Sequence, residues 1–115
     1  MGTRLRIIDP PSRESGYHPP EFDHDGQPCR DPATDRLLPG CMWRDPDMDV
    51  RALGLEGWAV ILPNGTVWYT TEGAGGTGNR WTVTGVPPNI TVSPSIDDRG
   101  PRGWHGWIKD GEMVP

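Results

Sequence analysis

The sequence contains no apolar run close to the roughly 18 residues that a membrane-spanning helix requires. Its first residues, MGTRLRIIDPP, lack the apolar stretch and the small-residue cleavage site of a signal peptide. We therefore expect an intracellular protein with no membrane partner, in which the only two cysteines, Cys29 and Cys41, are reduced. A disulfide between them remains the alternative if the mature protein is exposed outside a cell.

Basic and hydrophobic residues are also scarce. The 11 Lys and Arg residues are outnumbered by 16 Asp and Glu, and the net charge of −5 does not attract phosphate backbones, so no nucleic-acid partner is expected. Hydrophobic residues make up 33%, which limits the size of the core. The six tryptophans nevertheless argue against a disordered chain, because disordered segments lack large apolar side chains.

Proline and glycine, by contrast, are abundant. A chain of 115 residues fits a single domain, in which we expect a first strand within residues 1–8, an irregular arm over 9–56 and a β-core over 57–115. Each proline of the arm fixes φ and removes a backbone donor, so neither a long helix nor a central strand should form there. A short helix over Asp47–Leu55, with an aspartate as cap and Gly57 as terminator, is the best helical candidate.

The second half has the composition of β-strands. Asn64-Gly65 and Asp110-Gly111 each stand between runs rich in β-branched and aromatic residues, which is the strongest short-range signal for a hairpin. The predicted fold is all-β: a small antiparallel sheet or sandwich of about six strands with a long, irregular, proline-rich N-terminal arm. A polar loop is expected over Pro94–Gly103. The expected strands are Arg4–Ile8, Trp58–Leu62, Thr66–Thr71, Arg80–Thr84, Ile90–Ser93 and Trp104–Ile108, the last closing on Met113-Val114.

Cysteine and histidine could together hold a metal. Zinc prefers thiolate and imidazole ligands, and His24, Cys29 and Cys41 could be joined by His105 in a structural site that clips the arm to the core. No C-x2-C knuckle is present, so two free thiols and solvated histidines are the alternative. A structural zinc is thus a possible cofactor.

The C-terminal third holds the residue types of a serine hydrolase. Ser93 or Ser95 could act as nucleophile, His105 as base and Asp97 or Asp98 as the acid that orients the base. No G-x-S-x-G nucleophile elbow is present, so the sequence does not fix their geometry.

His105 stands between two tryptophans. Successive side chains of a strand point to opposite faces, so His105 should share a face with Trp107, and Trp104 should lie on the other. A hydrogen bond at the margin of the core is one interpretation of His105, and a ligand or groove contact is the other. Exposed aromatic residues concentrate at interfaces, and those expected to bind a protein partner are Tyr17, Phe22, Trp43, Trp104 and Trp107.

The last third of the chain resembles a small protein family found in bacteriophages, prophages and some bacterial gene clusters. The resemblance rests on WTVTGVPPNITVSPSI at 81–96 and WHGWIKDGEMV at 104–114, with Pro88, the PSI at 94–96, His105-Gly106 and Asp110-Gly111 as matching positions. It implies a phage-related, non-enzymatic protein, and it implies Cys41 and His105, with Cys29, as zinc ligands. The paired cysteines of some relatives are absent here.

Three functional hypotheses follow. The first is a phage-encoded accessory protein that acts by binding a host or phage protein, as a modulator of a host factor or defence system, without enzymatic activity. The second is a virion component, such as a minor head or tail protein. The third is a zinc-dependent or serine hydrolase centred on His105. The sequence does not indicate an oligomeric state.

Overall fold

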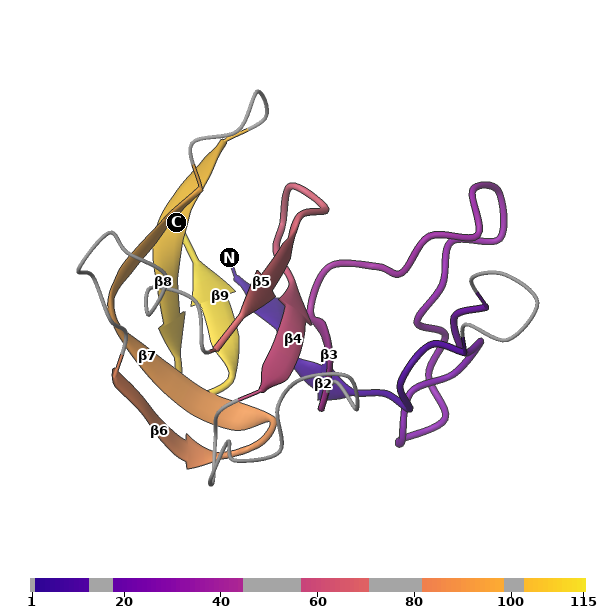
Figure 1. Ribbon diagram of the computed structural model, residues 1–115, viewed down its shortest axis with the longest axis horizontal. Coiled ribbons are helices and arrows are strands. Elements are labelled where there is room, and N and C mark those ends of the chain that lie inside the picture. Colours follow the sequence, from indigo (N-terminus) through magenta and orange to yellow (C-terminus); the bar gives the residue numbers. More distant parts are fainter. Residues whose placement is uncertain (1, 13–17, 45–56, 71–81, 99–102) are drawn as a thin grey trace.

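The computed structural model describes residues 2–12, 18–44, 57–70, 82–98 and 103–115. This part of the chain forms nine strands and no helix, and the strands make two sheets (Figure 1). It therefore contains no helix that is long and apolar enough to cross a membrane. The all-β fold predicted from the sequence is confirmed.

The larger sheet has five antiparallel strands. Their order across the sheet is β1 (Thr3–Arg4), β9 (Glu112–Val114), β8 (Trp104–Lys109), β7 (Asn89–Asp98) and β6 (Thr82–Val86). The smaller sheet has four strands, in the order β2 (Arg6–Ile7), β3 (Cys41–Arg44), β4 (Trp58–Ile61) and β5 (Val67–Tyr69). Within it β2 and β3 are parallel, and the other pairs are antiparallel.

The two sheets bury one apolar cluster between them. Alternate residues of the four-stranded sheet, such as Met42 and Val60, point into this cluster, as the period of two along a strand requires. Ile96 and Ile108 of the five-stranded sheet meet them from the other side. The buried members are Leu5, Met42, Val60, Leu62, Trp68, Ile90, Val92, Ile96, Ile108 and Met113.

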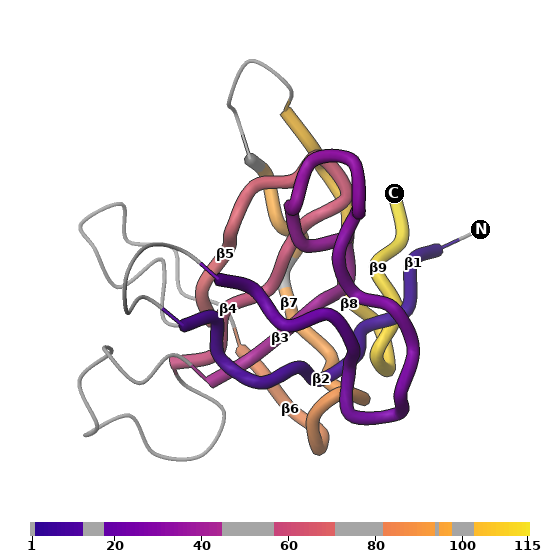
Figure 2. Tube along the Cα trace, turned by 90° about the vertical axis from the view of Figure 1, so that its right-hand side faces the viewer, coloured from indigo at the N-terminus to yellow at the C-terminus, as the bar shows by residue number. Residues whose placement is uncertain are grey.

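The part of the arm that precedes β3, residues 18–40, covers the opposite face of the four-stranded sheet. Cys29 and Leu37 of the arm pack against Trp43, Ala59 and Ile61 in a second buried cluster. Figure 2, which looks onto the arm, shows it in front of β2, β3 and β4. The molecule is thus layered as five-stranded sheet, four-stranded sheet and arm, and the outer face of the five-stranded sheet lies farthest from the arm.

Two tight turns predicted from the sequence form, one in each sheet. Asp110 and Gly111 have φ values of +47° and +78° and join β8 to β9, which is the two-residue hairpin predicted for Asp-Gly. The Gly111 N–H donates to the Ile90 carbonyl at 2.8 Å, which fixes the turn against β7. At Asn64-Gly65 the predicted turn also forms, but only Gly65 takes a positive φ, of +88°.

Three predictions of local structure are corrected. The first strand is divided at Leu5, where the chain passes from the five-stranded to the four-stranded sheet. The arm region does contain an interior strand, β3, because four residues without proline follow Gly40. The strand β7 continues through Pro94 to Asp98, where a polar loop was expected, and an irregularity in its pairing accommodates the proline. The helix predicted over Asp47–Leu55 lies outside the described residues.

Candidate active site

A serine and a histidine meet on the outer face of the five-stranded sheet. The Nε2 atom of His105 on β8 lies 3.1 Å from the Oγ atom of Ser95 on β7, within hydrogen-bonding distance. His105 is exposed and Ser95 is partly exposed, so a substrate can approach both side chains from solvent. This is the spacing required between a nucleophile and its general base.

A bulge in β7 brings Ser95 into this position. Val92 is paired with Ile108 and Ile96 with Gly106, so three residues of β7 stand opposite the single residue Trp107. The middle residue of the three is Pro94, which has no N–H to donate and fits where the regular ladder is interrupted. Pairing resumes at Ile96, which points into the core, so the neighbouring Ser95 faces outward beside His105.

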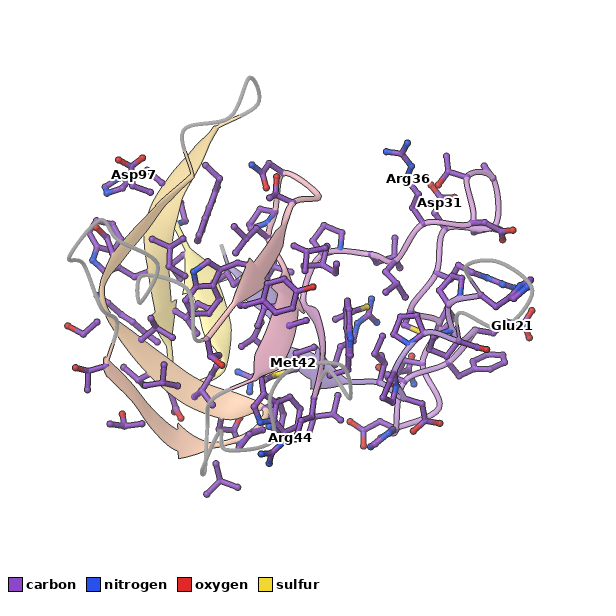
Figure 3. All side chains as sticks on the ribbon, in the orientation of Figure 1. Glu21, Asp31, Arg36, Met42, Arg44 and Asp97 are labelled. Atoms are coloured by element: carbon purple, nitrogen blue, oxygen red, sulfur yellow. The ribbon has the colours of Figure 1, made fainter. Side chains whose placement is uncertain are left out.

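Asp97 supplies a carboxylate on the same face. It stands directly opposite His105 in the antiparallel register, and side chains opposite one another in such a pair project to the same side with Cβ atoms about 5 Å apart. Figure 3 shows Asp97 pointing outward from β7, away from the four-stranded sheet. Asp97, one of the two aspartates proposed from the sequence, is therefore placed on the same face as the imidazole.

Trp107 flanks the imidazole on its other side. The two ring centroids are 5.3 Å apart with the planes inclined at 61°, an edge-to-face contact, which confirms that His105 and Trp107 share a face. Trp104 packs against the core between the sheets, on the opposite face, as the period-two argument requires. Beyond Trp107, the Nζ atom of Lys109 lies 5.7 Å from the centroid of the indole.

The two cysteines lie in the second cluster. The Cys41 thiol donates to the Cys29 carbonyl at 3.4 Å, and the Cys29 thiol donates to the Pro20 carbonyl at 3.2 Å. Both are free thiols with no exposed surface. Desolvation by burial raises the pKa of both, that of Cys41 to about 11, while the nearby Arg6 guanidinium partly opposes the rise.

The four residues considered as zinc ligands are not brought together. Cys29 and Cys41 are neighbours, but the His24 imidazole is 2.9 Å from the Asp9 carboxylate. The His105 imidazole is hydrogen-bonded to Ser95 in the five-stranded sheet. Within the described ranges, no three His, Cys, Asp or Glu side chains form a group that could hold a metal ion.

The aromatic residues expected at an interface differ in exposure. Trp43 is 5% exposed and belongs to the second cluster, so it is corrected from a surface contact to a core residue. Its strand was assigned to the irregular arm, which is why the sequence did not reveal its burial. Phe22 is 55% exposed, and Trp104 and Trp107 are partly buried. Tyr17 lies outside the described residues.

One family model matches the chain. It is described as the bacterial ubiquitination-like system serine protease (BubE), and the match covers residues 62–115. That range includes β5 to β9 and therefore Ser95, Asp97 and His105. No curated protein and no solved structure matches the chain.

Proposed function

We propose that the protein is a serine peptidase in which Ser95 is the nucleophile and His105 the general base. The observation that carries the proposal is the 3.1 Å contact between Ser95 Oγ and His105 Nε2 on an accessible sheet face. The matched family, described as a serine protease of a bacterial ubiquitination-like system, supports the same reaction class. Because a protease cleaves polypeptides, the proposed substrate is a polypeptide.

The chemistry follows from the positions of these side chains. His105 Nε2 accepts the proton of Ser95 as Oγ attacks the carbonyl carbon of the scissile bond. It then donates that proton to the leaving amine, which leaves an acyl group on Ser95. A water molecule, deprotonated by the same nitrogen, releases the acyl group and restores the serine.

Further groups stabilise the two charges that form during the reaction, on the imidazole and on the carbonyl oxygen. Asp97, opposite His105, stabilises the imidazolium that forms while the proton is on the ring. The oxyanion needs N–H donors, and the backbone N–H groups of Ser95 and Ile96 are the candidates at the bulge, since Pro94 has none.

The serine peptidase replaces the non-enzymatic binding protein as the favoured hypothesis. The zinc-dependent form of a hydrolase loses support, because Cys29 and Cys41 lie in a different cluster from His105. A phage-encoded protein that binds a host or phage partner is the second candidate, favoured by the 55% exposure of the Phe22 side chain. The virion role stays a prediction.

The test is covalent labelling with a fluorophosphonate probe, which reacts with activated serines. Intact-mass analysis should show one adduct on the purified full chain, and peptide mapping should place it on Ser95. Ser95→Ala should abolish the adduct, and His105→Ala should slow its formation about 100-fold or more, since general-base catalysis contributes about 10²–10⁴-fold.

Ser93→Ala is the matched control. Ser93 is also exposed on β7, on the other side of Pro94, and pairs with Thr82 rather than with His105. Its substitution should leave labelling unchanged. An adduct that persists in Ser95→Ala, or that maps to Ser93, contradicts the proposed nucleophile.

A further inference from the structure

The outer face of β8 carries a row of three side chains that begins at the dyad. His105, Trp107 and Lys109 occupy alternate positions of one strand, so they project to the same side. Residues two apart in a strand are separated by about 6.5–7 Å along its axis. Lys109 therefore stands about 13 Å along the strand from His105, with the indole of Trp107 between them.

The middle of this row is an apolar platform. Trp107 is only partly buried, and its ring contacts the His105 imidazole at one edge while the Lys109 ammonium lies over it. An aromatic ring left partly accessible beside a nucleophile offers an apolar surface to a bound segment. Trp107 thus lies where a substrate side chain near the scissile bond would pack.

The far end of the row is a cation. Lys109 is exposed, and among the residues that the structure describes it makes no ion pair, although Glu112 stands opposite it on β9. The dyad end instead carries the carboxylate of Asp97. The row therefore runs from the Ser95–His105 contact, with Asp97 opposite His105, to a cation at Lys109.

We propose that the row His105–Trp107–Lys109 selects the substrate, and this inference rests on the proposed peptidase function. The substrate is an extended polypeptide segment, whose side chains on one side repeat with the same spacing as the row. A residue two positions from the scissile bond packs on Trp107, and an acidic residue four positions from the bond pairs with Lys109. Exposure of the dyad on an open strand face suits an extended chain better than a small ligand, which binds in a concave pocket.

The test is cleavage of a peptide library, prepared from a bacterial proteome, by the full chain, with cleavage sites read by mass spectrometry. The wild-type protein should enrich Asp and Glu about twofold to fivefold at the fourth position on one side of the cleaved bond, a range suited to a single exposed ion pair. Lys109→Glu should remove that enrichment and favour Lys and Arg there instead. Trp107→Ala should remove any apolar preference at the second position.

Arg36→Glu is the matched control. It makes the same change of charge at an exposed residue of the arm, away from the five-stranded sheet (Figure 3), and should leave the preference unaltered. Fluorophosphonate labelling of the wild-type protein and of Lys109→Glu distinguishes failure of the substrate proposal from failure of the peptidase proposal. If Ser95 is labelled but the library stays uncut, or is cut with no acidic preference that Lys109→Glu changes, the substrate proposal is wrong. If Ser95 is not labelled in the wild-type protein, the peptidase proposal itself fails.

Discussion

The thiol of Cys41 shows how burial sets the chemistry of a single residue. Its sulfur has no exposed surface, and desolvation raises its pKa to about 11 from an ordinary value of 9.0. A thiolate is the form that ligates metal and attacks electrophiles, so at neutral pH both properties are suppressed. In the described structure the two cysteines are therefore core residues of the layer between the arm and the four-stranded sheet.

This shift predicts a loss of stability at high pH. Because the folded state holds the Cys41 proton more tightly than the unfolded state, the contribution is fully present below about pH 9 and is lost as the pH rises to about 11. We expect the free energy of unfolding, measured by urea titration, to fall by about 2 kcal/mol across that window. Cys41→Ala should be less stable at pH 8 but should show a smaller fall, and an equal fall in both proteins would assign the pH dependence to other groups.

At the same scale, the sequence resolved the faces of β8 but not the choice of nucleophile. A period of two sufficed to place His105 with Trp107 and to place Trp104 opposite, because β8 is regular around them. Ser93 and Ser95 could not be distinguished, since their orientation depends on where the bulge in β7 falls. A proline inside the alternating run VSPSI was the one signal for that bulge.

At the scale of elements, the absence of a side chain at Gly106 leaves room for the Trp104 indole and for the backbone of β9. A Cβ atom on Gly106 would lie 2.5 Å from a ring carbon of Trp104 and would also meet the carbonyl oxygen of Val114. The indole can therefore lie along β8 only because the residue two positions further has no side chain. The glycine that follows the histidine in HGW thus has a packing role, beside the site rather than in it.

Gly106→Ala is expected to destabilise the protein by about 2–4 kcal/mol, because neither the β9 backbone nor the indole can yield without disturbing the sheet. Chemical denaturation followed by tryptophan fluorescence measures the change. Gly26→Ala serves as the control: its φ of +81° imposes a backbone penalty of about 1 kcal/mol, but no atom lies within 4 Å of the added methyl group. A smaller loss in Gly106→Ala than in Gly26→Ala would contradict the proposed packing.

Elements with strong local signals were predictable, and those fixed by distant contacts were not. The hairpin at Asp110-Gly111 formed as expected, because two adjacent residues tolerant of positive φ favour that turn locally. The strand β3 was missed since its pairing partners, β2 and β4, come from separate parts of the chain, and the proline-rich surroundings of Cys41 obscured it. The same holds for the division of the first strand at Leu5.

At the scale of the whole molecule, the two sheets depend on one shared core. Trp68 of the four-stranded sheet and Ile108 of the five-stranded sheet belong to the same buried cluster. Among the described residues, no second buried cluster joins the two sheets. The second cluster joins only the four-stranded sheet to the arm and its flanking residues. Ser95 and His105 are carried by β7 and β8, whose inward residues Ile96 and Ile108 belong to the shared cluster, so the geometry of the site depends on that packing.

Ile108→Ala should therefore weaken both sheets together. Truncation of a fully buried isoleucine costs about 2–5 kcal/mol, through lost apolar contact and the cavity left behind. Far-ultraviolet circular dichroism and tryptophan fluorescence, to both of which the two sheets contribute, should shift to the same lower urea midpoint in a single transition. Val86→Ala, at a side chain that is 75% exposed on the edge strand β6, should change the free energy of unfolding by less than about 0.5 kcal/mol. Two separate transitions in Ile108→Ala would show that the sheets fold independently, and the site would then need only the five-stranded sheet.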